Sequence, residues 1–443
     1  MKVVIVGGGI GGLAAALALH DLGIDVEVYE QSRELRELGV GINMLPHAVK
    51  ELASLGLLPE LDTTGVRTRE LVYANRLGQT VWQELRGVDA GYAMPQFGIH
   101  RGKLHGVLLR AVLERLGAAR VHTHCRLVDF QHRADQVIAT FDRGDPGERI
   151  EVVADALIGA DGIHSSARAL LYPHEGPPAW NGIMLWRGTT EWPVYADGRT
   201  MVIAGGNAAK FVVYPIYADP SKPETRLTNW AIMARLGDGT APPPRREDWN
   251  RPGRLEEAVV FMRGRFRLDF FDPVSLIEAT GTFYEYPACD RDPLSRWSFG
   301  RVTLLGDAAH PMYPVGGNGA SQAILDARAL ASHLASGALV PEALAAYDAE
   351  RRPPTTEIVL TNRKGGPEGV IDIVEARAPD GFADIETVAS YAEREAIVRG
   401  YASMAGYARD QVNRAEPKRS ETHHWDLRTA CFGRRPRLGL QQD

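Results

Sequence analysis

The chain has 443 residues, of which 44% are hydrophobic and 24% are charged, and its formal net charge is −6. This length exceeds what one hydrophobic core usually supports, so we expect two domains and a C-terminal appendage. The negative charge argues against a nucleic-acid-binding protein and against attraction to an anionic membrane surface.

Cysteine usage and the N-terminus narrow the class further. The three cysteines, Cys125, Cys289 and Cys431, lie far apart and form no CxxC pair. This spacing argues against a disulfide framework or a thiolate metal site, so we expect no metal and a reducing, cytoplasmic location. We find no signal-peptide pattern and no apolar run of the roughly 20 residues that a membrane-spanning helix needs.

The first elements in chain order predict a parallel sheet. Residues 3–6 are apolar and β-branched without alternation, as in a buried strand. A glycine-rich turn, an Ala/Leu helix over 13–22 and a second strand over 25–30 follow. This order is that of a βαβ unit.

The middle of the chain changes in character. A helical pattern covers about 102–116, and 154–158 form another short buried strand. From about 180 to 235, runs rich in Trp, Val, Tyr and Thr alternate with turn residues, which predicts an antiparallel sheet. A helix is expected near 255–264.

The buried-strand pattern returns at 302–305, and a long helix follows from about 319 to 336. The stretch after about 365 is polar and mostly helical in pattern, with a less regular tail after about 410. We therefore predict an α/β fold with a Rossmann-like domain, an inserted antiparallel β-sheet domain and C-terminal helices. The predicted boundaries are 1–175 with 290–365, then 176–289, then 366–443.

The first motif is Gly7-Gly8-Gly9-Ile10-Gly11-Gly12, which matches GxGxxG between a strand and a helix. Gly7 permits the tight turn, Gly9 allows a pyrophosphate to approach the backbone, and Gly12 lets the helix pack on the strand. Glu30 ends the second strand, where a carboxylate can bind ribose hydroxyls. The motif does not separate FAD from NAD, and a structural glycine turn is the alternative.

Two further motifs follow strands much later in the chain. One is Gly159-Ala160-Asp161-Gly162, and the other is Gly306-Asp307-Ala308-Ala309-His310-Pro311, which leads to Pro314-Val315-Gly316-Gly317-Asn318-Gly319. With these residues the chain resembles the single-component flavoprotein aromatic hydroxylases, the class of para-hydroxybenzoate hydroxylase, over about residues 1–360. Within that class it looks most similar to phenazine-modifying monooxygenases, on stretches such as Met184-Leu185-Trp186-Arg187-Gly188 and Gly319-Ala320-Ser321-Gln322.

The resemblance implies a role for each motif residue. Gly7, Gly9, Gly12 and Glu30 would hold the ADP half of a non-covalent FAD, and Arg101 its pyrophosphate or ribityl region. Asp307 would bind the ribityl chain, and Asp161 with Gly162 would help admit NADH or NADPH. Pro314, Gly316, Gly317, Asn318 and Gly319 would lie by the flavin ring.

Physical chemistry supports part of this assignment independently. Asp307 follows a buried strand, at the sheet edge where open α/β folds bind ligands. The glycines at 316–319 precede a helix, whose N-terminus stabilises negative charge such as that of reduced flavin. The alternatives are a capping or turn role for Asp307 and Asp161, and a solvated side chain for Arg101.

The substrate should lie between the flavin and the β-rich domain. Candidate lining residues, each with a plain core role as the alternative, are Trp186, Met201, Val213, Tyr214, Trp230, Met312 and Tyr313. His310 could be a base, but packing is the favoured interpretation. No other catalytic constellation is evident, as expected where a cofactor carries the chemistry.

The resemblance therefore implies an NAD(P)H-consuming FAD monooxygenase, a monomer or homodimer, that acts through a flavin C4a-hydroperoxide and O2. The expected substrate is a planar aromatic, such as a phenazine carboxylate or a hydroxybenzoate, hydroxylated with or without decarboxylation. The alternatives are a FAD-dependent dehydrogenase or reductase without oxygen insertion and a non-enzymatic protein on the same fold.

Overall fold

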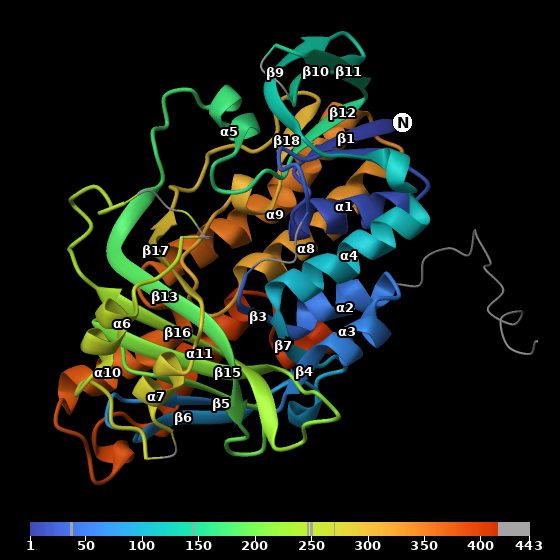
Figure 1. Cartoon of the computed structure of the whole chain (residues 1–443). Helices are drawn as coiled ribbons and strands as arrows, with labels where there is room; N and C mark the ends of the chain where they lie inside the picture. The colour runs from blue at the N-terminus through green and yellow to red at the C-terminus, as the bar shows by residue number, and fades with distance from the viewer. Residues whose placement is uncertain (36–38, 145–146, 246–247, 249–250, 270, 415–443) are drawn as a thin grey trace, which may run out of the picture. The chain divides into compact units, whose positions relative to one another are not determined.

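A five-stranded parallel sheet carries the predicted motifs (Figure 1). The computed structural model describes residues 1–35, 39–144, 147–245, 248, 251–269 and 271–414. In spatial order the strands are β18 (Val302–Leu304), β12 (Ala156–Gly159), β1 (Lys2–Val6), β2 (Asp25–Tyr29) and β8 (Val121–His122). Helices cover both faces, so the inner strands are apolar throughout rather than alternating, and the predicted strands at 3–6, 25–30 and 302–305 are confirmed.

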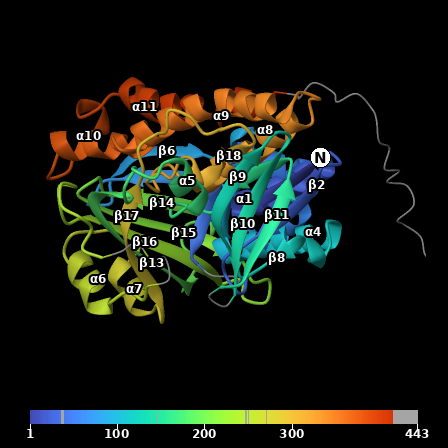
Figure 2. The ribbon, with the colours of Figure 1, turned by 90° about the horizontal axis from the view of Figure 1, so that it is seen from above.

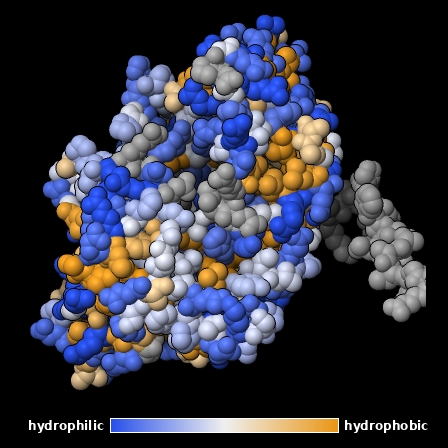
Figure 3. Space-filling view, viewed as in Figure 1, coloured by the Kyte–Doolittle hydropathy of each residue, from blue (hydrophilic) through white to orange (hydrophobic). Residues whose placement is uncertain are grey.

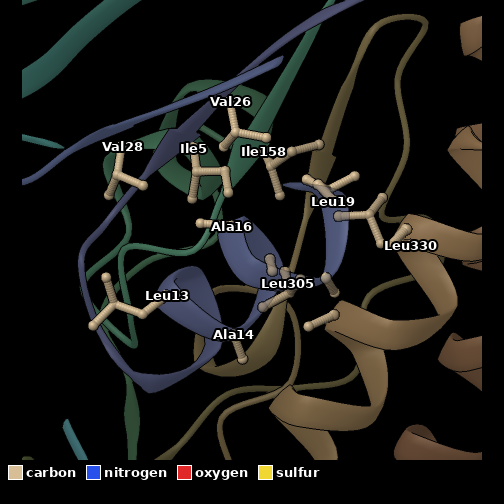
Figure 4. Packing of buried hydrophobic residues seen from close by; sticks show 14 of the residues in the cluster. Ile5, Leu13, Ala14, Ala16, Leu19, Val26, Val28, Ile158, Leu305 and Leu330 are labelled. Atoms are coloured by element: carbon tan, nitrogen blue, oxygen red, sulfur yellow. The ribbon is translucent and has the colours of Figure 1, made fainter. Parts of the chain in front are cut away.

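Helix α1 (Ile10–Asp21) is buried on all sides, because it packs between the sheet, α4 (Arg101–Arg115) and α8 (Gly319–Leu334). Figure 4 shows the small side chains Ala14 and Ala16 of α1 near Ile5 and Leu305. Small residues allow this close approach, which explains the Ala-rich helix. The helix begins three residues before the predicted 13–22, and those predicted at 102–116 and 319–336 are confirmed within two residues. The other helices of this half are α2 (Pro46–Ser54), α3 (Leu58–Thr64), α5 (Ser166–Leu171) and α9 (Val340–Asn362).

The predicted β-rich region is a seven-stranded sheet. Its order is β17 (Phe283–Asp290), β13 (Ala179–Pro193), β16 (Thr225–Arg235), β15 (Ala209–Tyr217), β14 (Thr200–Ala204), β5 (Glu70–Ala74) and β6 (Thr80–Leu85). All pairs are antiparallel except β14 with β5, which are parallel. Strands β5 and β6 come from the sequence before residue 175, so two parts of the chain build this sheet.

The two faces of the seven-stranded sheet pack against different helices. Figure 2 shows its strands between α6 (Leu255–Met262) with α7 (Pro273–Glu278) and α10 (Gly369–Arg377) with α11 (Tyr391–Met404). Trp186 and Trp230 pack in the core on the α6 face, whereas Met201 and Tyr214 pack on the α10 face. Since side chains alternate along a strand, each residue belongs to one face only.

Two small antiparallel sheets complete the fold. One has the order β11 (Arg149–Ala154), β10 (Gln136–Arg143) and β9 (Cys125–Arg133). The other has the order β3 (Gly41–Met44), β7 (Gln96–His100) and β4 (Gly65–Thr68). It packs against strands β15 and β16 of the seven-stranded sheet. The sequence analysis did not identify these strands. Strands β3, β4 and β7 have only four or five residues, whereas β9 and β10 are longer but rich in polar and charged residues.

Residues Met1–Asn413 form one unit that ends with α12 (Arg409–Asn413). Within the predicted C-terminal segment 366–443, the region before 414 is helical, and Cys431 and the tail lie outside the described residues. Figure 3 shows apolar side chains at the surface over α6, where Val260 is 72% exposed. No helix among the described residues is long and apolar enough to cross a membrane.

Candidate active site

A cavity of about 410 Å³ extends from the carboxyl ends of β1, β12 and β18 to the α10 face of the seven-stranded sheet. It therefore lies where open parallel sheets bind their ligands. All but one of the predicted cofactor residues line it: Gly7, Gly9, Glu30, Arg101, Asp161, Gly162, Asp307, Pro314, Gly316, Gly317, Asn318 and Gly319. The exception is Gly12.

The glycines of the first motif meet different surroundings. A Cβ at Gly12 would lie 2.0 Å from the Gly7 carbonyl oxygen, and one at Gly7 would lie 2.4 Å from the Ala160 oxygen. Both glycines are therefore required by the packing of the chain itself. A Cβ at Gly9 would meet nothing within 4 Å, although Gly9 lines the cavity. Packing within the chain therefore does not require glycine at position 9. A phosphate group that approaches the backbone closely would require it.

The N-terminus of α1 is well suited to an anion. Its N-cap, Gly9, provides no side-chain cap, and the first turn contains no acidic residue. The first backbone N–H groups therefore remain available at the positive end of the helix dipole. Glu30, only 9% exposed, lies beside this loop and accepts hydrogen bonds from the Gly8 and Ser32 N–H groups, both at 2.7 Å. Its carboxylate is fixed at the cavity wall.

Asp161 is a helix-capping residue that also lines the cavity. Its Oδ2 accepts hydrogen bonds from the backbone N–H groups of Ser166 at 2.6 Å and Ala167 at 3.2 Å, at the start of α5. Its Oδ1 accepts the Ser165 hydroxyl at 2.5 Å. Burial raises the pKa of Asp161, although these hydrogen bonds oppose the rise. The capping interaction fixes the turn that carries Gly162 beside the cavity.

Arg101 and Asp307 face the cavity with opposite charges. Arg101 begins α4, and Asp307 lies in the short 3-10 helix after β18. Burial lowers the pKa of Arg101 and raises the pKa of Asp307, while their mutual attraction opposes both shifts. The pair places a cation and an acceptor at separate strand ends, as a ligand with phosphates and hydroxyls requires.

His310 packs inside the protein and does not line the cavity. Its Nε2 lies 2.5 Å from Oδ2 of Asp326, and the same oxygen accepts the Gly306 N–H at 3.1 Å. Oδ1 of Asp326 accepts Nε of Arg351 at 2.7 Å. Asp326, which the sequence analysis missed, thus fixes the loop that carries Asp307. These contacts support the packing interpretation of His310.

Asp326→Asn should destabilise the protein at pH 7 by about 1.5–3 kcal/mol, the usual contribution of a hydrogen bond to a charged group. Burial alone would raise the pKa of Asp326, but His310 and Arg351 hold it below its ordinary value of 3.8. A depressed carboxyl pKa stabilises the fold above that ordinary value, and the stabilisation is lost as pH falls below it. Thermal unfolding of wild type and variant from pH 7 down to 3.5 should therefore show a difference that narrows below about pH 4.

The matched control for this prediction is Asp142→Asn. The Asp142 carboxylate also accepts hydrogen bonds from two arginines, Arg126 and Arg149, but both arginine side chains are exposed. Such surface pairs contribute little, so this control should unfold like the wild type. An Asp326→Asn protein as stable as the wild type at pH 7 would contradict the role of Asp326.

The turn before α8 is held by the C-terminal part of the chain. Gly316 and Gly317 have φ values of +65° and +63°, which favour glycine, and a Cβ at Gly316 would lie 2.9 Å from the ring of Tyr401 in α11. The Gly316 N–H donates to Oε1 of Glu368 at 3.0 Å, and Glu368 also forms a buried ion pair with Lys210. The N-cap of α8 is Asn318, which makes no side-chain cap. A second uncapped helix N-terminus therefore faces the cavity.

Four of the seven predicted substrate-lining residues line the cavity: Met201, Tyr214, Met312 and Tyr313. Trp186, Val213 and Trp230 lie instead in the core between the opposite face and α6. The register explains the difference, since β13 turns Leu185 and Arg187 toward the cavity and therefore Trp186 away from it.

The cavity is also lined by polar groups that the sequence analysis did not assign to the site, among them Arg187, Asn229, Tyr73, Arg86 and Glu368. A signal for Arg187 was present, because it follows Trp186 directly and strand periodicity puts the two on opposite faces. For Arg86 and Glu368 no local signal exists, because they reach the cavity from sequence-distant segments.

Comparison with known proteins identifies relatives over most of the chain. The model of the FAD binding domain family matches residues 1–235 and 289–361. A phenazine 1,6-dicarboxylic acid hydroxylase of Lysobacter antibioticus is 45% identical, covering 82% of this chain and 89% of that protein. 3-Hydroxybenzoate 6-hydroxylase 1 of Aquipseudomonas alcaligenes is 30% identical, covering 82% and 88%. The structure of Klebsiella pneumoniae HpxO with FAD and uric acid superposes with a TM-score of 0.71 at 26% identity, covering 93% and 96%.

Proposed function

Because the chain belongs to the FAD binding domain family of aromatic hydroxylases, we propose that its substrate is a planar aromatic carboxylate such as a phenazine carboxylate or a hydroxybenzoate. The enzyme is a FAD-dependent monooxygenase. The observation that carries the substrate proposal is that one cavity brings together the motif residues and a face of the seven-stranded sheet that carries apolar side chains. A cofactor and a flat apolar substrate can therefore touch there.

The residues present fit a non-covalent FAD. Gly9 provides the unfilled approach to the backbone at the α1 N-terminus, and Glu30 offers a fixed carboxylate near it. Arg101 and Asp307 would contact the pyrophosphate and the ribityl chain, and residues 316–319 the ring. FAD bound there would supply the chemistry of the reaction, that is, electron transfer from NADH or NADPH and insertion of one oxygen atom of O2 into the substrate ring. We further propose a cytoplasmic monomer or homodimer.

The chain itself would supply position and electrostatics. Two helix N-termini, of α1 and α8, offer N–H groups to the negative charge of the phosphates and of the reduced ring. Apolar side chains on the sheet, among them Leu71, Ile203 and Met233, exclude water from the reacting ring. The described residues that line the cavity include no histidine, the most frequent general base, so we expect an electron-rich substrate ring that brings its own nucleophilicity. A ring carbon that bears a carboxylate could then lose CO2 as aromaticity returns.

Labelled dioxygen tests this function directly. Phenazine-1-carboxylate and 3-hydroxybenzoate are each tested in the presence of NADH or NADPH. The true substrate should accelerate oxidation of the nicotinamide donor, and its product should carry one labelled oxygen atom. Oxygen derived from water, or no aromatic that accelerates donor oxidation, would contradict oxygen insertion and favour a dehydrogenase on the same fold.

A further inference from the structure

Arg187 presents a positive charge inside the cavity. It lies in β13, lines the cavity, and donates from Nη2 to the Gly41 carbonyl at 2.5 Å and from Nη1 to the Tyr286 hydroxyl at 3.0 Å. The Tyr214 hydroxyl also bonds to it. Burial would lower the pKa of Arg187, but these phenol groups outweigh it and the pKa is raised. The guanidinium therefore stays charged.

No carboxylate among the described residues pairs with Arg187. Its acceptors are one carbonyl and two hydroxyls, whereas a guanidinium has five N–H donors. The other three arginines of the cavity differ, since each faces a carboxylate. Arg86 pairs with Glu84 at 2.5 Å, Arg126 pairs with Asp142 at 3.2 Å, and Arg101 is attracted by Asp307. A charge removed from water without a counter-ion is costly, so its site favours an anionic occupant.

Asn229 provides a second, independent sign of a ligand. Its Oδ1 accepts the Gly41 N–H at 2.7 Å, and this contact fixes the amide orientation because an N–H must face an oxygen. Nδ2 is then a buried donor without a hydrogen-bond partner among the described residues, in a side chain that is 0% exposed and lines the cavity. Buried donors are normally satisfied, so this one indicates a missing acceptor.

The two side chains are neighbours. Arg187 pairs with Ala231 across β13 and β16, and Asn229 is two residues from Ala231, so both lie on the cavity face. Both also bond to Gly41, one to its carbonyl and one to its N–H. A cation and an unsatisfied donor thus lie together on the cavity face of the sheet, beside the apolar residues Leu185, Ala231 and Met233.

We propose that Arg187 and Asn229 form the subsite that binds the carboxylate of the aromatic substrate. The proposal rests on the proposed function and adds to it the residues that make the enzyme prefer anions. A carboxylate would accept from both groups, while the ring lies along the apolar face toward Met233 and Leu185. The anion thereby sets which ring carbon meets the flavin.

The test measures ligand binding to the FAD-loaded protein through the change in flavin absorbance. The probes are phenazine-1-carboxylate and its neutral methyl ester. Wild type should bind the acid at least about tenfold more tightly than the ester. Arg187→Met should weaken acid binding by about 10- to 100-fold and ester binding by about twofold at most, and Arg187→Lys should restore part of the loss.

Asn229→Asp is the sharper variant, because it keeps the oxygen that accepts the Gly41 N–H and replaces only the unsatisfied donor with a negative charge. It should weaken acid binding at least about tenfold and leave the ester unaffected. The matched control is Arg235→Met, an exposed arginine of the same sheet that donates to the Asn181 carbonyl. This control should bind both probes like the wild type.

Each outcome separates the proposals. Equal binding of acid and ester by the wild type would overturn the subsite while the proposed function stands. Equal losses of acid and ester in both variants, or weaker FAD binding in titrations of the apoproteins, would show that Arg187 and Asn229 only hold Gly41 or contact the flavin. A wild type that binds neither probe nor any hydroxybenzoate would overturn the proposed function together with the subsite.

Discussion

Gly9→Val should leave the apoprotein folded and weaken its FAD affinity by at least about 100-fold, or about 2.8 kcal/mol. Gly9 has φ −76° and ψ −177°, an extended conformation that valine adopts readily, and no atom lies within 4 Å of its Cβ position. The side chain would instead fill the space where a pyrophosphate approaches the N-terminus of α1. Titration of FAD into the apoprotein, with circular dichroism as the measure of folding, gives both results.

Gly12→Ala is the matched comparison, because it adds a smaller group in the same motif. Its Cβ would lie 2.0 Å from the Gly7 carbonyl oxygen, so the helix must move away from β1. We expect this variant to lose both folding stability and FAD binding, whereas Gly9→Val loses binding alone. A Gly9→Val protein that binds FAD like the wild type would refute the placement of the cofactor.

The different surroundings of the two glycines show what sequence reasoning can reach. The βαβ start, the strand at 302–304 and the long helix after it were predicted because local apolar patterns determine them. The three motifs were then expected to meet, because carboxyl ends of parallel strands share one edge of the sheet. Twelve of the thirteen predicted cofactor residues line one cavity for this reason.

The substrate side was harder to predict, because composition identifies a strand but not the face to which each residue belongs. Trp186 and Trp230 were predicted to line the substrate site, with a core role as the alternative, and they fill the core against α6. Their neighbours Arg187 and Asn229 have the opposite orientation. A one-residue change of register exchanges all of these positions, and only the pairing of distant strands fixes the register.

Residues after 365 could not be assigned to the site from the sequence either. Tyr401 of α11 accepts a hydrogen bond from Asn318 at 3.2 Å and donates one to Asn362 at 2.7 Å. Glu368 lines the cavity and holds the N–H of Gly316. These contacts join the C-terminal segment to the turn at the start of α8. Local sequence patterns cannot predict contacts between segments so far apart in the chain.

The Lys210–Glu368 ion pair stabilises this junction, and Lys210→Met should lower the free energy of unfolding by about 3–5 kcal/mol. Lys210 is 2% exposed and Glu368 is 3% exposed, so removal of the lysine leaves a buried carboxylate without its cation. Since Glu368 also accepts the N–H of Gly316, the turn that lines the cavity at Gly316 should loosen as well. Denaturant unfolding followed by circular dichroism measures the first effect, and release of flavin fluorescence at lower denaturant concentration measures the second.

Two further variants decide whether the buried charge is the cause. Lys210→Met combined with Glu368→Gln removes both charges and keeps a side-chain oxygen for Gly316, so it should recover much of the lost stability. Lys222→Met removes an exposed lysine that pairs with Glu191 and should leave the unfolding midpoint unchanged. If the double variant were as unstable as Lys210→Met alone, the loss would come from packing around the lysine stem instead of the unpaired carboxylate. The ion pair would then not be what holds the C-terminal segment against the turn at Gly316.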